Sequence, residues 1–205
     1  MVQAARIGSR SKIAPTAVIH HKKKLLLGRD VTIMDFAVIG LSNYYQDIFE
    51  HERQKVVRLG NHCRVYPWAL IYEGATLESG VVMEERTTVG SLTTVGAKTR
   101  IVYQAQVNDR IAIGQECVIG GFIADNCTIG KGCSIFGALV HRYQNPDTRA
   151  WDTTDEAGPI LEDGVVVGWG AVVVGSVRIG ARAQILPNAL VTEDVPSGAK
   201  YVGRC

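Results

Sequence analysis

The sequence has no long run of apolar residues, and its longest apolar stretches are far too short to span a bilayer. Its first residues contain no apolar core of the kind found in signal peptides. Lys and Arg number 22 against 20 Asp and Glu, and a net charge of +2 creates no field that would attract nucleic acid or an anionic membrane. These absences favour a cytoplasmic protein with no membrane span and no nucleic-acid partner.

Metal-binding and redox motifs are also lacking. No two of the five cysteines form a Cys-x-x-Cys pair. Cysteines recur instead at one position of the repeat described next, where Ala and Thr also occur, and there they are expected to be small buried apolar residues. The cysteines that share this position are Cys63, Cys117, Cys127 and Cys133. Neither a disulfide framework nor a cysteine nucleophile is expected.

What the sequence does contain is a repeat of six residues. Reading from Leu59 gives LGNHCR, VYPWAL, IYEGAT, LESGVV, MEERTT, VGSLTT, VGAKTR, IVYQAQ, VNDRIA and IGQECV, and every block opens with Leu, Ile, Val or Met. The phase restarts after a short irregular piece at 119–122 and again at Leu161, and the part from Ile7 onward follows the same rule. Because a missed repeat leads to the wrong fold, this period has priority over local propensity.

The repeat predicts an all-β fold. The first position of a block is a branched aliphatic residue, apart from Met83, and the fifth is usually small, so both are expected to point into a narrow triangular prism. Three blocks would make one coil, and stacked coils would pair parallel strands about 4.8 Å apart. A β-sandwich would show a period of two instead. We therefore expect one domain over 1–205, a parallel β-helix, with loop insertions at about 45–58 and 141–159.

The stretch from Val165 to Arg204 resembles the C-terminal coils of hexapeptide-repeat acyltransferases, most of all the sugar and nucleotide-sugar acetyltransferases; it reads VVVGWGAVVVGSVRIGARAQILPNALVTEDVPSGAKYVGR. The resemblance implies a left-handed β-helix, a homotrimer with active sites at subunit contacts, and acetyl transfer from acetyl-CoA to an amino or hydroxyl group of a sugar or nucleotide-sugar. The end of the chain departs from the pattern, because Tyr201–Cys205 lacks the usual Pro-Ala pair.

Acetyl transfer needs a base to remove the acceptor proton, and an imidazole, whose ordinary pKa is about 6.5, suits this task. His141 opens the second insertion, where the resemblance places a catalytic histidine. The structural alternative is a histidine at a strand end that is hydrogen-bonded to a backbone carbonyl. The remaining histidines are expected on solvated edges or outside the prism; they are His20, His21, His51 and His62.

The donor acetyl-CoA would lie along the C-terminal coils. Small residues there permit close approach of its extended arm, and cationic side chains could meet its phosphates. The donor-binding candidates are Gly168, Gly170, Ala171, Ala189, Lys200 and Arg204. The neighbouring Trp169 could form a wall of this groove or lie in a subunit interface.

Acceptor recognition is assigned to polar and aromatic residues of the second insertion. These candidates are Arg142, Tyr143, Asn145, Asp147 and Trp151. No metal is expected. A γ-type carbonic anhydrase, which shares this fold, needs three converging imidazoles, and the histidines here do not show that spacing. A non-catalytic β-helix that serves as a structural or partner-binding module is the main alternative.

Overall fold

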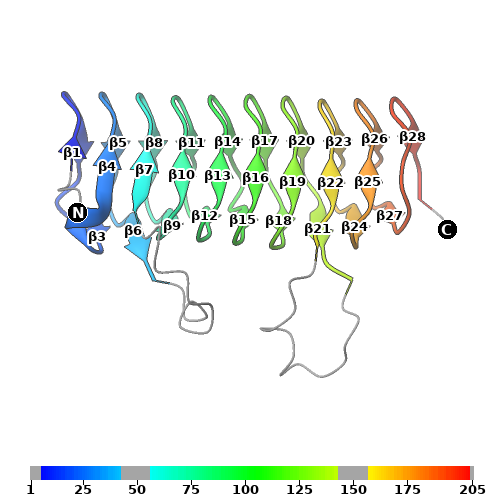
Figure 1. Cartoon of the computed structure of the whole chain (residues 1–205), viewed down its shortest axis with the longest axis horizontal. Coiled ribbons are helices and arrows are strands. Elements are labelled where there is room, and N and C mark those ends of the chain that lie inside the picture. The colour runs from blue at the N-terminus through cyan, green and yellow to red at the C-terminus, as the bar shows by residue number, and fades with distance from the viewer. Residues whose placement is uncertain (1–5, 43–55, 143–156, 204–205) are drawn as a thin grey trace, which may run out of the picture.

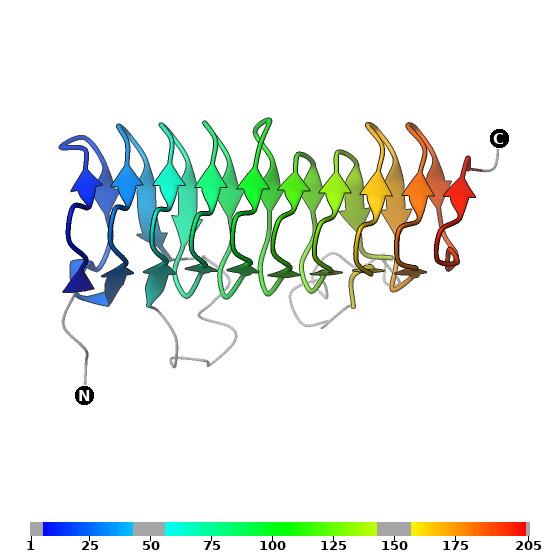
Figure 2. The same cartoon turned by 90° about the horizontal axis from the view of Figure 1, so that it is seen from above.

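The computed structural model describes residues 6–42, 56–142 and 157–203. Short strands stack into three parallel sheets that run the length of the molecule and enclose a prism (Figure 1). This confirms the parallel β-helix that the repeat predicts and the left-handed form that the resemblance implies. We call the sheets A, B and C and name each prism edge by the two sheets that meet there, so that the chain passes the A–B, B–C and C–A edges in turn. Figure 2 shows the same stack from above.

Sheet A contains β1 (Arg6–Ile7), β4 (Leu25–Leu27), β7 (Val57–Leu59), β10 (Thr76–Leu77), β13 (Thr94–Val95), β16 (Ala112–Ile113), β19 (Thr128–Ile129), β22 (Ile160–Leu161) and β25 (Arg178–Ile179). Sheet B contains β2 (Lys12–Ile13), β5 (Thr32–Ile33), β8 (Arg64–Val65), β11 (Val82–Met83), β14 (Arg100–Ile101), β17 (Val118–Ile119), β20 (Ser134–Ile135), β23 (Val166–Val167), β26 (Gln184–Ile185) and β28 (Lys200–Tyr201). Sheet C contains β3 (Val18–Ile19), β6 (Val38–Leu41), β9 (Leu70–Tyr72), β12 (Thr88–Val89), β15 (Gln106–Val107), β18 (Phe122–Ile123), β21 (Ala138–Val140), β24 (Val172–Val174) and β27 (Leu190–Val191).

Apart from one short 3-10 helix, η1 (Lys22–Lys24), the structure describes only strands and turns. Within residues 6–42, 56–142 and 157–203, no helix is long and apolar enough to cross a membrane.

The six-residue repeat sets the register. Residue 76 pairs with residue 94, a separation of eighteen, so three blocks make one coil as expected. Two neighbouring coils in the middle of the stack are shorter, because residue 106 pairs with 122 and residue 122 with 138. Their missing residues are at the B–C edge, where only two residues separate β17 from β18 and β20 from β21. A further step of sixteen residues joins residue 184 to residue 200 at the C-terminal end. The irregular piece expected at 119–122 is therefore a tight corner that leaves a notch in this edge.

Glycine is required at this tight corner. A Cβ on Gly121 would overlap the backbone carbonyl oxygen of Gly137, one coil further on. Neither backbone can move away without breaking the ladder, so the notch depends on the absence of a side chain.

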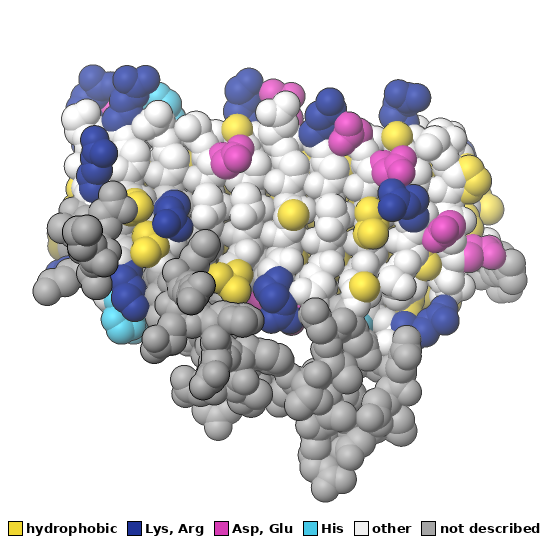
Figure 3. Space-filling view, in the orientation of Figure 1, with side chains coloured by type: hydrophobic (Ala, Val, Ile, Leu, Met, Phe, Trp, Pro, Cys, Tyr) yellow, Lys and Arg dark blue, Asp and Glu magenta, His cyan; other side chains and the backbone are white. Residues whose placement is uncertain are grey.

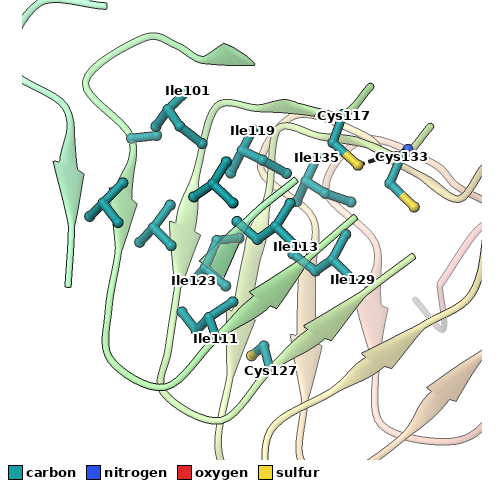
Figure 4. Close-up of a cluster of buried hydrophobic side chains, with 14 of the residues drawn as sticks. Ile101, Ile111, Ile113, Cys117, Ile119, Ile123, Cys127, Ile129, Cys133 and Ile135 are labelled. Atoms are coloured by element: carbon teal, nitrogen blue, oxygen red, sulfur yellow. Dashed lines mark hydrogen bonds between the residues drawn. The ribbon is translucent and has the colours of Figure 1, made fainter. Parts of the chain in front are cut away.

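The core is a stack of aliphatic residues (Figure 4). Ile101, Ile119 and Ile135 follow one another beneath sheet B, each at most 1% exposed. Cysteines fill interior corner positions in the same way, and the N–H of Cys133 donates to Sγ of Cys117 at 3.4 Å. Because water is excluded there, fully burying such an aliphatic side chain contributes about 1.5–3 kcal/mol.

The four cysteines at the fifth position are buried, as the sequence predicts. Burial raises the pKa of the Cys63 thiol to about 11 and that of the Cys127 thiol to about 12, since a thiolate would lose its hydration. Both side chains are thus neutral apolar fillers at physiological pH.

The prism edges are held by side chains that reach from one coil to the next. Asn61 Oδ1 accepts the backbone N–H of Arg29 at 3.0 Å, and Asp163 Oδ1 accepts that of Lys131 at 2.9 Å. Ion pairs such as Lys98–Glu116 add to these bonds, and Figure 3 shows Lys, Arg, Asp and Glu side chains gathered along the A–B edge at its upper margin. Each exposed pair contributes at most about 1 kcal/mol.

The three outer faces differ in charge. In the described strands, the outward positions of sheet A include Arg6, Arg58 and Arg178, and sheet B also presents cationic side chains. The paired outward positions of sheet C carry no charged residue; they are Val18, Val38, Leu70, Thr88, Gln106, Phe122, Ala138, Val172 and Leu190. An uncharged, mostly apolar face is unusual for a surface that contacts only water.

Both expected insertions leave the prism at the C–A edge. The first follows β6 and the second follows β21, and residues 43–55 and 143–156 lie outside the described part of the chain. One boundary needs correction. Val57 and Arg58, assigned to the first insertion from the sequence, belong to strand β7, which pairs with β4. Val57 is buried and Arg58 faces outward, as the repeat requires, so the insertion ends before these two residues.

Candidate active site

His141 stands at the end of a line of polar residues on the C–A edge. In five successive coils, the residue two positions beyond the buried residue of sheet C is polar: Glu73, Ser91, Asp109, Asp125 and His141. Hydrogen bonds connect the members of the line, since Ser91 N–H donates to Asp109 Oδ1 at 2.6 Å and Asp109 N–H donates to Asp125 Oδ1 at 2.9 Å. The line runs between the anchor points of the two insertions, which makes this edge the candidate active site.

The ring of His141 is oriented by the backbone. Its Nε2 lies 2.7 Å from the carbonyl oxygen of Asp125, one coil earlier, and the residue is partly buried. A carbonyl can only accept, so Nε2 carries the hydrogen of the neutral ring and Nδ1 carries the lone pair. This bond is also the one that a purely structural histidine would make, so it leaves both interpretations of His141 open.

The opposite end of the line is buried. Glu73 is 2% exposed and Ser91 1%, beside the point where the first insertion begins. Within the described residues, Ser91 Oγ has no hydrogen-bond partner. A buried hydroxyl without a partner is costly, which marks this end as a place where polar groups of the protein or a ligand would be stabilised.

Sequence reasoning found only His141 among these five residues. A signal was present for four of them, because Glu73, Ser91, Asp109 and Asp125 occupy the third position of their six-residue blocks, whereas His141 directly follows the block 135–140. It becomes visible only when each block is assigned to its sheet, since every third block contributes to the same edge.

The acceptor candidates are only partly described. Arg142 is exposed and lies against Gly175 of the next coil. The other four, Tyr143, Asn145, Asp147 and Trp151, lie outside the described residues.

The donor candidates lie at the B–C edge and on sheet B. Gly168, Gly170 and Ala171 connect β23 to β24, Ala189 precedes β27, and Lys200 is exposed in β28. Arg204 lies outside the described residues.

Packing alone explains several of these small residues. Ala171 and Ala189 point into the prism and are buried, so a ligand could reach only their backbone. A Cβ on Gly168 would lie 2.6 Å from the backbone nitrogen of Pro187, and Gly170 has a φ of +71°. Their contact with a donor therefore stays a prediction, and Lys200 is the member whose side chain is open to a ligand.

An aromatic cluster surrounds the notch in the B–C edge. Tyr103 and Trp169 are 66% and 63% exposed, and their ring centroids lie 6.4 Å apart in an edge-to-face arrangement. Phe136 lies 6.0 Å from Tyr103. Further along the same edge, Phe36 stacks on Trp68. The surface next to the donor candidates is thus aromatic and unusually exposed.

His141 and the donor candidates occupy different edges of one prism. His141 is on the C–A edge, whereas Gly168, Gly170 and Ala189 are on the B–C edge, and the face of sheet C lies between them. A single chain does not bring the two sets together.

A hollow of about 970 Å³ lies elsewhere, on sheet A and the A–B edge of the first coils. Arg6, Arg29 and Arg58 line it, and none of the candidate residues does. Among the described residues, no three His, Cys, Asp or Glu side chains are grouped as metal ligands. His62, expected outside the prism, is indeed exposed and lies 3.6 Å from Asp30.

Known proteins share the fold of this chain and resemble parts of its sequence. No family model matches the chain. The bifunctional protein GlmU of Polaromonas naphthalenivorans is 30% identical over 103 residues, which are 45% of this chain and 22% of that protein. The 2,3,4,5-tetrahydropyridine-2,6-dicarboxylate N-acetyltransferase of Staphylococcus aureus is 32% identical over 78 residues, 38% of this chain and 28% of that protein. The matches thus span less than a third of either relative.

The solved structure of Arabidopsis UDP-N-acetylglucosamine acyltransferase covers 91% of this chain and 69% of its own, with a TM-score of 0.52 and 20% sequence identity. At that identity the similarity shows a common fold. The chain is therefore a left-handed parallel β-helix protein of the hexapeptide-repeat class. Within this class it resembles the acyltransferases, which include the Staphylococcus and Arabidopsis proteins by name.

Proposed function

We propose that the protein is an acyltransferase of the cytoplasm that transfers an acetyl group from acetyl-CoA to an amino or hydroxyl group of a sugar or nucleotide-sugar. The observation that carries the proposal is the placement of His141. It ends a polar line on the edge from which both insertions leave, and its ring is oriented by a backbone bond of 2.7 Å. The named relatives, which include an N-acetyltransferase and an acyltransferase, support the reaction class.

The chemistry assigned to His141 is general base catalysis. The acceptor nitrogen or oxygen attacks the thioester carbonyl carbon while Nδ1 of His141 takes the acceptor proton. The new C–N or C–O bond forms, the C–S bond breaks, and the imidazolium then returns the proton to the departing thiolate. A positioned base of this kind contributes about 10²–10⁴-fold to the rate.

The donor site is proposed at the C-terminal coils. Lys200 would meet the phosphates of coenzyme A as a point charge, and the exposed Trp169 and Tyr103 would border its extended arm. The short corners at the notch remove two residues from each of two coils, and aromatic rings border the space that is left.

We further propose that the active form is a homotrimer. Two features support it. The face of sheet C is uncharged and mostly apolar, which suits burial against another copy. The same face separates His141 from the donor candidates within one chain, so a neighbouring prism would bring the base of one copy to the donor groove of the next. Closed threefold assembly then gives three equal sites.

The competing function is a non-catalytic β-helix module. It is favoured by the fact that packing explains Gly168 and Ala171 and that the His141 bond suits a structural role as well. Ligand binding separates the two functions.

Thermal unfolding in the presence of acetyl-CoA, coenzyme A or ATP is the first test. A ligand at about 100 times its dissociation constant stabilises the folded state by about 2.7 kcal/mol. We expect stabilisation by both coenzyme A species and none by ATP, followed by acceptor-dependent release of free thiol from acetyl-CoA. No stabilisation by any of the three would reject the acyltransferase and favour the module.

A further inference from the structure

We propose that Arg110 and Asn126 are positioning residues that fix the orientation of His141 through the backbone of Asp125. The effect on turnover rests on the proposed function. The effect on the imidazole ring does not, because it follows from the contacts alone.

Both the backbone carbonyl and the side-chain carboxylate of Asp125 make contacts. Its backbone carbonyl oxygen lies 2.7 Å from Nε2 of His141. Its carboxylate oxygen Oδ1 accepts the backbone N–H of Asp109 at 2.9 Å, and Oδ2 lies 3.5 Å from Nη2 of Arg110. A rotation of the Asp125 peptide would therefore disturb the imidazole bond.

Arg110 spans the corner that contains this peptide. Besides its contact with Asp125, its Nε donates to Oδ1 of Asn126 at 2.9 Å. Asn126 has a left-handed backbone with a φ of +59°, and its N–H donates to the carbonyl of Asp109 at 3.2 Å. One guanidinium thus binds the side chains of both residues next to the peptide that orients His141. The planar, preorganised fork of arginine suits such a double contact.

The second insertion closes on the same carbonyl. Gly158, where the chain returns to the prism, is buried, and a Cβ there would lie 2.8 Å from the Asp125 carbonyl oxygen and 2.7 Å from Cys127 Sγ. His141 opens the insertion and Gly158 ends it, so both of its anchor points meet at Asp125. The described residues at both ends of this insertion therefore contact the peptide that orients the ring.

Contacts of the same kind occur at other corners, and they supply a control. Elsewhere on this edge, Asp109 Oδ1 accepts the N–H of Ser91 in the same manner. A matched contact exists far from His141, where Arg10 binds Asp30 through Nε and Nη2 at 2.6 Å each, also from a left-handed corner residue with a φ of +60°. We call the contacts of Arg110 with Asp125 and Asn126 the arginine clamp, and Arg10→Ala is the control for the loss of such a contact.

The experiment compares Arg110→Ala, Asn126→Gly and Arg10→Ala in the full chain. Glycine tolerates the positive φ of position 126 and removes the side-chain amide that Arg110 binds. The first readout is the ¹⁵N spectrum of the imidazoles, with His141→Gln to assign the signal. We expect the Nε2–H tautomer in the parent and the control, and a mixed tautomer in the two clamp variants.

The second readout is kinetic. We expect kcat to fall about 10- to 100-fold in Arg110→Ala and Asn126→Gly, as misplacement of a catalytic group does, with an altered pH profile and a KM for acetyl-CoA within about twofold. Arg110→Lys keeps the charge near Asp125 but loses the fork, so its kcat should be intermediate.

An unchanged tautomer in both clamp variants would overturn the proposal, as would a kcat loss no larger than that of Arg10→Ala. If the parent protein transfers no acyl group to any acceptor, the proposed function fails, and the tautomer measurement still decides the positioning role. Should Arg110→Ala fail to fold, Asn126→Gly carries the test by itself.

Discussion

The imidazole Nε2 of His141 lies 2.7 Å from the carbonyl oxygen of Asp125, a residue sixteen positions earlier that occupies the same place in the preceding coil. In an ordinary coil the two would be eighteen residues apart. The coil between Asp125 and His141 is two residues short, and the missing residues are at the B–C edge. The strands on either side still pair in register, so the two residues occupy equivalent places on the C–A edge.

Removal of the imidazole should abolish most of the turnover. We expect His141→Ala to reduce kcat about 10²–10⁴-fold while its affinity for coenzyme A and its assembly stay unchanged. His62→Ala is the control, since that side chain is exposed on the A–B edge. Steady-state kinetics with acetyl-CoA provide the measurement. Full activity in His141→Ala would reject the base assignment.

A charge placed on the face of sheet C should prevent assembly. Leu190 is 52% exposed and Phe122 38% exposed in the single chain. Lysine at either position would bury an unpaired charge in the proposed interface, at a cost of several kcal/mol. We expect smaller species in size-exclusion chromatography with light scattering. Val166→Lys on sheet B, from a residue 39% exposed, should leave the assembly intact. A parent protein that is monomeric would contradict the interface.

The notch should tolerate no side chain at Gly121. In Gly121→Ala the Cβ meets the Gly137 carbonyl, so backbone has to move, and we expect a loss of about 3 kcal/mol or more. Gly132→Ala is the control, because nothing lies within 4 Å of its Cβ position and only its φ of +66° is unfavourable, which costs about 1–2 kcal/mol. Thermal unfolding compares the two. Equal losses would show that the corner is not tightly packed.

The buried thiols predict a loss of stability in alkali. In the folded state burial raises the pKa of Cys63 to about 11 and that of Cys127 to about 12, above the ordinary value of 9.0. The unfolded state therefore releases protons first as the pH rises. The stabilising contribution is complete below pH 9 and is lost as the pH approaches 11–12, by about 1.4 kcal/mol per pH unit for each thiol.

The double variant Cys63→Ala, Cys127→Ala isolates this effect from other titrating groups. Alanine occupies equivalent buried positions at Ala69 and Ala75, so it should fit. Urea unfolding between pH 8 and 11 should show a shallower decline in the variant than in the parent. Parallel declines would mean that these thiols ionise as easily in the folded chain as in the unfolded one.

Much of the fold could be predicted from the sequence because the repeat encodes it directly. Branched aliphatic residues at the first position and small ones at the fifth predicted the interior residues, including Cys63 and Cys117. The same rule places Ala171 and Ala189 inside the prism, where the structure has them, so only their backbone could meet a donor, and that contact stays a prediction. The end of the first insertion was placed too late. Val57 and Arg58 precede the first complete block, which begins at Leu59, so the repeat did not mark them as strand residues.

The candidate site was less accessible to sequence reasoning. His141 was found through its position at an insertion, but Arg110 and Asn126 act on it from a preceding coil, and Gly158 from the far end of a long connection. Those relationships depend on which blocks share an edge, and the two short coils shift that assignment by two residues each. A six-residue period alone does not reveal that shift.

Because both insertions leave from the C–A edge, the prism fixes the distance between their anchor strands. Their anchor strands β6 and β21 are five steps apart in sheet C, so the solenoid holds them about 24 Å apart along its axis. That span can change only in whole coils of about 4.8 Å. A chain with one coil deleted between them would keep the sequence of both insertions and yet bring their anchor strands closer by one fixed increment.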